Sequence, residues 1–340
     1  MRQLALLVTP ARLGGLLVAG AAATLAALYL IPSDDYLLLP DPAHPVAPLV
    51  EVQGGHDPRG PGGVYFVDVL ERRASTLESL LPWLHPGGTL VPARLIVPPG
   101  VSDEAARQAD LREMSISQKV AAAVALRRLG YRVAARPDGV IVSVVEVGTH
   151  AEGRLQPADV IVSVDRTPTP TVAALRRKLA QANVGQVVAL GVRRGGRRLT
   201  VRVETVADPL DPKRAIVGFT PDQSARITLP IRVSIDAGNV GGPSAGLAFA
   251  LEVMEELGRD VTHGYRVAAT GEIELNGAVA PIGGVKQKTI GARDAKADVF
   301  LVPAGDNARE ARRYADGLRI IPVRSFPQAL RALATLPPKR

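Results

Sequence analysis

The chain has 340 residues, of which 46% are hydrophobic and 22% charged, and this balance excludes a wholly disordered protein. It contains no cysteine, which excludes disulfides, cysteine nucleophiles and zinc sites built on thiolates. The net charge of +8 comes from scattered arginines with few aromatic residues among them, so we do not expect the protein to bind nucleic acid.

The first predicted element is a membrane-spanning helix over residues 13–31, an uncharged apolar run long enough to cross a bilayer. Two arginines precede the run and two aspartates follow it. The positive-inside rule therefore predicts residues 1–12 in the cytoplasm and the rest of the chain on the extracytoplasmic side. A cleaved signal peptide is the alternative, but the run ends in Leu-Tyr-Leu-Ile-Pro, which is a poor cleavage site. We expect a single-pass protein of the cell membrane that contacts the lipid bilayer through residues 13–31.

Segments rich in proline and glycine separate short regular elements from residue 32 to residue 124. The pattern predicts a strand at 64–70, a helix at 77–81, a broken segment at 85–103 and a helix over 115–129 that ends at Gly130.

Residues 125–206 have the pattern of a compact β-rich unit. We predict strands at 139–145 and near the end of 155–165, a helix over 171–181 and a hairpin formed by 187–193 and 199–203. The segment Leu155-Gln156-Pro157-Ala158-Asp159-Val160-Ile161 resembles the "GL-x-x-GD-x-I" segment of bacterial protease PDZ domains, with Ala158 where glycine is usual. The resemblance implies that peptide C-termini bind at a carboxylate-binding loop formed by Leu129, Gly130, Tyr131, Arg132 and Val133. The alternative is a small β domain that only packs against its neighbour.

Residues 207–214 read as a linker, and strands alternate with helices after it. The predicted strands are 227–235, 265–274, 299–302 and 318–323, and the predicted helices are 245–257 and those that begin at 285, 306 and 327.

The segment Gly241-Gly242-Pro243-Ser244-Ala245-Gly246 places Ser244 between glycines, at the start of a predicted helix. A helix N-terminus offers unpaired N–H groups and a positive dipole end, an environment that favours an oxyanion and suits a serine nucleophile. The backbone N–H groups near Gly242 and Ser244 are the candidate oxyanion hole. The alternative is that Ser244 only caps the helix.

Such a serine needs a base. The segment also satisfies G-x-S-x-G, but only His263 follows Ser244, too close in sequence for a Ser-His-Asp enzyme of that order. A buried, neutral lysine can take the proton instead. On a helical wheel Lys288 falls on the more apolar face, whereas Lys286 falls beside Arg293 on a solvated face, so Lys288 is the better candidate.

Three segments together resemble the proteolytic domain of Lon-type serine proteases in order and spacing. They are Gly242-Pro243-Ser244-Ala245-Gly246, Thr270-Gly271-Glu272-Ile273 and Pro281-Ile282-Gly283-Gly284-Val285-Lys286-Gln287-Lys288. The resemblance implies a dyad of Ser244 and Lys288, with Thr270 orienting the lysine amine. Two departures are that Gly241 stands where Lon has aspartate, and that these residues carry no ATPase module.

The whole chain is similar to membrane-anchored, PDZ-containing Lon-like proteases. This similarity implies an α+β fold with an inserted PDZ-like β domain. It also implies that the strand at 64–70 belongs to the protease part. We divide the chain into a cytoplasmic segment (1–12), a transmembrane helix (13–31), the N-terminal part of the protease region (32–124), the PDZ-like domain (125–206) and the Lon-type domain (207–340).

The predicted function is ATP-independent serine endopeptidase activity on unfolded or flexible polypeptides, without metal or cofactor. A homo-oligomer is compatible with the resemblance, because Lon-type domains form rings. A catalytically silent PDZ-bearing scaffold is the main alternative. A Ser-Lys signal peptidase is disfavoured because Ser244 lies far beyond the apolar run.

Overall fold

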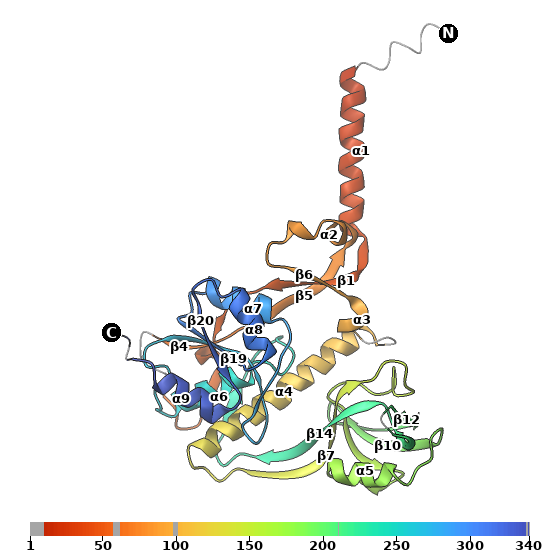
Figure 1. The fold of residues 1–340 in the computed structure, drawn as a ribbon, viewed down its shortest axis with the longest axis vertical. Helices are drawn as coiled ribbons and strands as arrows, with labels where there is room; N and C mark the ends of the chain where they lie inside the picture. Colours follow the sequence, from red (N-terminus) through yellow and green to blue (C-terminus); the bar gives the residue numbers. More distant parts are fainter. Residues whose placement is uncertain (1–9, 57–61, 98–100, 210, 338, 340) are drawn as a thin grey trace. The chain divides into compact units, whose positions relative to one another are not determined.

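The structure is a computed structural model that describes residues 10–56, 62–97, 101–209, 211–337 and 339 (Figure 1). The chain divides into two compact units, one made of residues 1–39 and 69–96 and the other of residues 40–68 and 97–340. The predicted segment 32–124 is therefore divided between the two units. Residues 1–9 of the predicted cytoplasmic segment lie outside the described residues.

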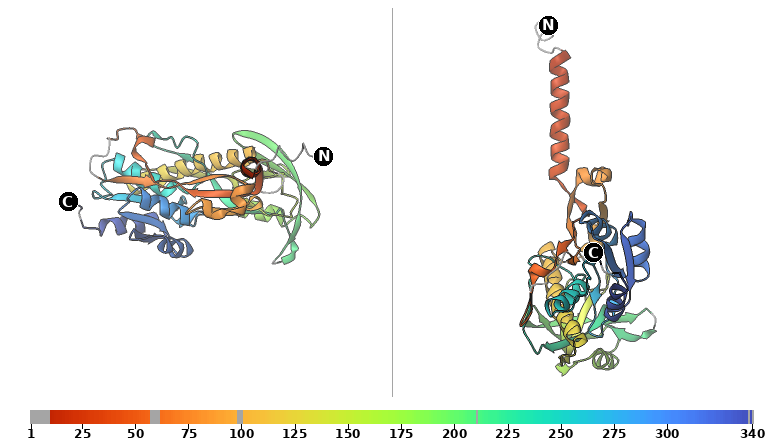
Figure 2. Two further views of the ribbon diagram at one scale, coloured as in Figure 1. Left: turned by 90° about the horizontal axis from the view of Figure 1, so that it is seen from above. Right: turned by 90° about the vertical axis from the view of Figure 1, so that its left-hand side faces the viewer.

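Helix α1 (Pro10–Leu30) belongs to the first unit and is one continuous helix in Figures 1 and 2. Apolar side chains along it are exposed, including Leu17 at 73% and Leu30 at 79%. Within the part of the chain that the structure describes, no helix combines the length and the apolar character needed to cross a membrane.

The rest of the first unit is a three-stranded sheet in the order β5–β1–β6, with short helices attached. Its elements are β1 (Pro32–Pro40), β5 (Val69–Ser75), α2 (Thr76–Leu80), a 3-10 turn (Pro82–Leu84), β6 (Thr89–Pro92) and α3 (Ala93–Ile96). Ser75 and Glu78 form a capping box that begins α2. The Arg72 guanidinium, 2.6 Å from the buried Glu78 carboxylate, holds the pKa of Glu78 well below its usual range. Strand β5 therefore leads into α2 through a fixed turn.

The second unit is built around a five-stranded sheet in the order β2–β4–β16–β19–β20. All neighbouring strands are parallel except β2 and β4. The strands are β2 (His44–Pro45), β4 (Gly63–Phe66), β16 (Arg266–Ala269), β19 (Val299–Pro303) and β20 (Arg319–Val323). The strand predicted at 64–70 is thus two strands: β4 lies in this sheet, and β5 belongs to the first unit.

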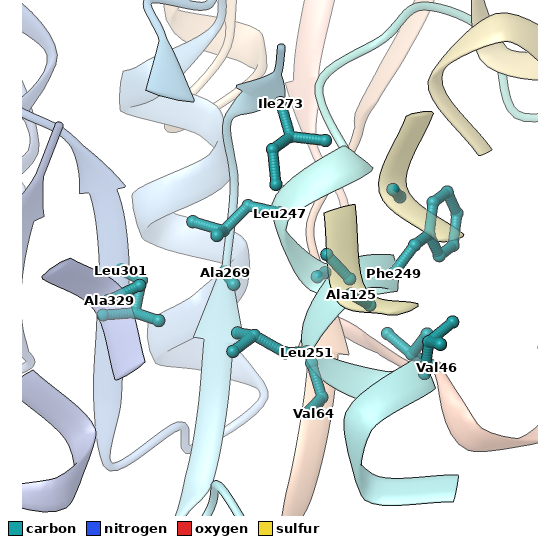
Figure 3. Close-up of a cluster of buried hydrophobic side chains, with 14 of the residues drawn as sticks. Val46, Val64, Ala125, Leu247, Phe249, Leu251, Ala269, Ile273, Leu301 and Ala329 are labelled. Atoms are coloured by element: carbon teal, nitrogen blue, oxygen red, sulfur yellow. The ribbon is translucent and has the colours of Figure 1, made fainter. Parts of the chain in front are cut away.

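Helix α6 (Gly246–Glu256) lies at the centre of the larger hydrophobic core, because nearly all of its residues are buried. Leu247 and Leu251 lie on the side of β16 and β19, and Phe249 lies on the side of α4 (Asp103–Arg128), where Ala125 is labelled (Figure 3). A helix buried on nearly every side must be covered by neighbouring elements, and these neighbours cover it. The N-terminus of α6 is therefore held rigidly.

Smaller elements complete this core. They are a 3-10 turn (Ala47–Leu49), the pair β3 (Val50–Val52) and β15 (Val233–Ile235), the pair β17 (Glu272–Ile273) and β18 (Val279–Ala280), and helices α7 (Val285–Asp294), α8 (Asp306–Arg313) and α9 (Phe326–Ala334).

Between α4 and β15 the chain forms a second sheet with its own hydrophobic core. The strand order is β11–β10–β8–β7–β14, and β9 pairs with β8. The elements are β7 (Ala134–Val145), β8 (Val160–Val164), β9 (Thr167–Pro168), α5 (Val172–Leu179), β10 (Val187–Arg194), β11 (Arg197–Glu204) and β14 (Phe219–Thr228). Strands β7 and β14 form a long antiparallel pair that is visible in Figure 1.

Two predicted elements are wrong, and a third, a helix, is confirmed except for its first residue. The linker at 207–214 is instead part of a hairpin of β12 (Val206–Asp208) and β13 (Asp211–Ile216). The strand at 227–235 is the end of β14 and the separate strand β15, because Pro230 interrupts the run and the two strands pair with different partners. The helix predicted over 115–129 begins earlier, at Asp103, where Ser102 caps it.

Candidate active site

The loop that carries Ser244 is fixed by three hydrogen bonds, two from the segment after β16 and one from α4. The Ser244 carbonyl accepts from the Gly271 N–H at 2.8 Å and from the Thr270 hydroxyl at 3.2 Å, both just after β16. The Ser117 hydroxyl of α4 donates to the Pro243 carbonyl at 2.9 Å. Gly242 has a φ of 77°, a left-handed conformation that glycine adopts without strain. The turn before α6 is therefore held in a defined position.

Lys288 of α7 lies against this loop. Its Nζ donates a hydrogen bond to Ser244 Oγ at 2.6 Å, across 44 residues of sequence. Lys288 is buried, and this burial lowers its pKa to about 8, against a smaller opposing effect of the Asp68 carboxylate. About a tenth of the amine is therefore neutral at pH 7, far more than for an exposed lysine.

The wheel argument about the two lysines of α7 agrees with the side chains' surroundings. Lys288 is buried, whereas Lys286 is half-buried with its Nζ 5.8 Å from the ring centre of Tyr314. Asn307 fixes the loop before α7, since its amide bonds both the N–H and the carbonyl of Ile282, at 2.8 and 2.9 Å. The first turn of α7 therefore presents Lys288, and not Lys286, to Ser244.

The Thr270 hydroxyl has a different hydrogen-bond partner from the one that the resemblance implies. Its hydroxyl donates to the Ser244 carbonyl, and among the described residues no hydrogen bond joins it to Lys288. Thr270 is completely buried. Its hydroxyl therefore positions the serine loop, whereas the resemblance had it orient the lysine amine.

The two candidate oxyanion donors also differ. The Gly242 N–H is already bonded to the Asp110 carbonyl of α4 at 2.9 Å, so it is not available to an oxyanion. The Ser244 N–H has no bonded partner in the described part of the chain. It lies two residues before the first residue of α6, where the helix dipole favours negative charge.

Asp68 is a residue that the sequence analysis missed. It follows β4, and β4 runs parallel to β16, which leads into Thr270 (Phe66 pairs with Ala269). One Asp68 oxygen is buried without a hydrogen bond, and His44 Nε2 lies 3.9 Å from it. Burial, helped by nearby Asp41, raises the pKa of Asp68. The parallel pairing of the predicted strands at 64–70 and 265–274 was the signal that would have found it.

The predicted carboxylate-binding loop is a helix cap. The N–H groups of Gly130 and Tyr131 bond the Arg127 and Leu126 carbonyls at 3.0 Å each, with Gly130 at a φ of 91°. This is a Schellman motif that ends α4. The Leu129 N–H also bonds within α4, and its side chain packs on the protease-side core. Three of the five predicted donors, the N–H groups of Leu129, Gly130 and Tyr131, are thus occupied within α4 and are not available to a carboxylate.

The comparisons with known proteins agree with these two regions. Residues 212–334 match the family described as Lon protease (S16) C-terminal proteolytic domain, and residues 127–205 match the PDZ domain family. "Lon protease 2" of Bacillus subtilis (strain 168) is 35% identical over 123 residues, 36% of this chain and 21% of that protein. "Lon protease 1" of Sorangium cellulosum (strain So ce56) is 40% identical over 95 residues, 28% of this chain and 12% of that protein. The match thus spans about a fifth of these relatives or less.

Among solved structures, the PDZ domain of the SdrC-like protein from Listeria monocytogenes is 21% identical, with a TM-score of 0.23. The match covers 25% of this chain and 87% of that one. This TM-score is too low to support an argument about the fold. Strand β4 precedes the PDZ-type segment, and its parallel partner β16 follows it. The chain thus combines a Lon-type proteolytic segment with a PDZ-type module inserted between strands of one sheet.

Proposed function

We propose that the chain is a serine endopeptidase that uses Ser244 and Lys288 as a dyad. The observation that carries the proposal is the 2.6 Å contact between Lys288 Nζ and Ser244 Oγ, made by a buried lysine whose pKa is lowered to about 8. An exposed lysine would be protonated and unable to accept a proton. A neutral amine beside a hydroxyl is the arrangement that activates a serine nucleophile.

In the first step the Lys288 amine takes the Ser244 hydroxyl proton while Oγ forms a bond to the scissile carbonyl carbon. The negative charge passes to the carbonyl oxygen, which the Ser244 N–H and the α6 dipole stabilise. The C–N bond then breaks, and the Lys288 ammonium returns the proton to the leaving amine. Water, deprotonated by the same amine, hydrolyses the acyl-enzyme and restores Ser244.

The substrates that we propose are unfolded or flexible polypeptides, cleaved without ATP. The 340 residues contain no G-x-x-x-x-G-K-[ST] phosphate-binding pattern, so this chain has no site of that kind with which to couple cleavage to nucleotide hydrolysis.

The test is covalent labelling of Ser244 with a fluorophosphonate, combined with cleavage of denatured casein without nucleotide. We expect labelling and cleavage by the unmodified protein, and neither by Ser244→Ala. A protein that binds peptides but is neither labelled nor able to cleave casein would support the alternative of a catalytically silent scaffold.

We also propose that residues 13–31 anchor the chain in the cell membrane, with the protease outside the cytoplasm. The proposal rests on the uncharged apolar run and on the exposed apolar side chains of α1. The expected result is that the full chain stays in the membrane pellet after alkaline carbonate extraction, and that deletion of residues 1–31 releases it. Extraction of the full chain by carbonate would contradict the anchor.

A further inference from the structure

One edge of strand β7 in the PDZ-type module is occupied by another strand of the same chain. PDZ domains bind a peptide by adding it as a strand to an exposed sheet edge. In this module β14 occupies one edge of β7 along its length, and β8 pairs with the other edge only at Val140 and Ile141. Strand β14 pairs antiparallel with the whole of β7, from Phe219 opposite Val145 to Thr228 opposite Ala134.

Strand β14 is also anchored to helix α5. The Gln223 side chain accepts from the Val172 N–H, the first of α5, at 3.3 Å and donates to the Gly139 and Pro170 carbonyls at 3.0 Å each. These bonds hold the strand in register against both β7 and the helix. A peptide ligand would have to displace all of them to reach this edge of β7.

A cavity of about 1090 Å³ lies beside β14. Six consecutive residues of the strand, 222–227, line it. Residues of the neighbouring strands also line it, among them Val144 of β7, Val160 of β8 and Arg193 of β10, so the cavity extends from β14 over these strands. Residues 272–276, which are β17 and the turn that follows it, and residues of helix α4 complete the lining.

The same cavity reaches the catalytic loop at Pro243, next to Ser244. It therefore connects the free edge of the PDZ-type sheet with the site of the proposed peptidase reaction. Part of the edge is closed locally, since Asp222 bonds the Gln223 N–H and the Gln223 amide bonds the Ser224 carbonyl. Within the described residues, Ala225, Arg226 and Ile227 have no backbone partner outside β7, and they are the part nearest in sequence to Ser244.

We propose that this cavity binds an internal, extended segment of the polypeptide substrate, which pairs as a further strand with β14 at Ala225–Ile227 and leads to Ser244. The inference rests on the proposed peptidase function and names the substrate geometry of the same site. An internal segment is the occupant because strand pairing at the edge of β14 needs no terminal carboxylate, and three of the five N–H groups of the predicted carboxylate loop already bond within α4. Strand pairing uses only backbone groups and therefore accepts many sequences.

The test uses the full chain, whose lack of cysteine allows a single cysteine to be introduced cleanly. In a Ser244→Ala background, Arg226→Cys on β14 carries a benzophenone label, and Thr200→Cys on the opposite edge strand β11 is the matched control. Both side chains are exposed. The probes are casein-derived peptides with a free or an amidated C-terminus. We expect about tenfold more photocrosslinking from position 226 than from position 200, equal for both peptide forms.

A second measurement does not depend on the label. The unmodified enzyme is given peptides that are N-methylated at successive positions on the N-terminal and C-terminal sides of the cleavage site. We expect KM to rise about tenfold for alternate positions on one side, because each lost N–H removes a strand bond.

Four outcomes would overturn the inference: equal crosslinking from both positions, loss of crosslinking on amidation, crosslinks between two chains without peptide, or a flat methylation scan. Failure of the unmodified protein to cleave the peptides would contradict the peptidase function alone, since crosslinking at position 226 would still show the groove.

Discussion

Two sites of the second unit, the pair Ser244–Lys288 and the turn at Leu129–Val133, satisfy their hydrogen-bonding groups in different ways. Ser244 and Lys288 come from different helices and are brought together by the packing of α6 and α7 against one sheet. The turn at Leu129–Val133 satisfies its first three N–H groups within α4, through bonds to carbonyls only a few residues away. A site formed by tertiary packing keeps its side chains available for chemistry, whereas N–H groups that are satisfied within a helix are not available to a ligand.

The strongest way to break this comparison is to remove the lysine amine at nearly constant volume. Lys288→Met lowers kcat on a casein-derived peptide by on the order of a thousandfold or more, because Ser244 loses its base. Lys286→Met, two residues earlier on α7, is the matched control, and its kcat stays within about twofold of the unmodified protein's. Loss of activity in the Lys286 variant alone would show that the wrong lysine has been assigned.

Thr270→Val sharpens the account of how the serine loop is held. The variant keeps the shape but removes the hydrogen bond to the Ser244 carbonyl, so we expect kcat to fall by about tenfold. The pH at which activity is half-maximal should not change, because Thr270 acts on the loop. A shift of that midpoint would mean that Thr270 acts on the lysine amine after all.

The pH profile tests the burial of Lys288. The neutral amine is the active form, so kcat/KM rises with pH, with a midpoint near the lysine pKa of about 8. The Asp68 carboxylate favours the protonated amine, so Asp68→Asn moves the midpoint to lower pH and raises activity at neutral pH by about a few-fold. A midpoint that stays in place or moves to higher pH would exclude this role of Asp68.

The smallest effect concerns the helix cap. Gly130→Ala places a β-carbon at a φ of 91°, which costs about 1 kcal/mol of unfolding free energy without any steric contact within 4 Å. Denaturant unfolding measures the loss, and peptide binding should be unchanged. Unchanged stability together with lost binding of C-terminal peptides would restore the carboxylate-loop interpretation.

The sequence alone was sufficient to choose the candidate lysine, because that choice depends only on which face of one helix the lysine occupies. The wheel distinguished Lys288 from Lys286 because burial along α7 repeats with helical spacing. The segment 44 residues earlier was recognisable as a helix start by its glycines and serine. Both features are local, and the tertiary fold only had to bring them together.

Pairing between distant segments was harder to predict. The two prolines in 207–214 suggested a linker, but proline is tolerated in edge strands, and β12 and β13 are a two-stranded hairpin. The Leu-Gly-Tyr run at 129–131 fits a ligand loop and a helix cap equally well until the Leu126 and Arg127 carbonyls are known to be its acceptors. Asp68 has no local signal at all, because its position beside Lys288 depends on the parallel pairing of β4 with β16.

The separation of Ser244 from Lys288 along the chain also has a consequence for biosynthesis. A ribosome makes Ser244 first, and the serine has no base until β16 has entered the sheet and α7 has folded onto it. A hydroxyl without a base is a poor nucleophile. If the proposed dyad is the catalytic group, the incomplete chain therefore cannot cut itself or its neighbours, and the dyad is complete only once α7 has folded.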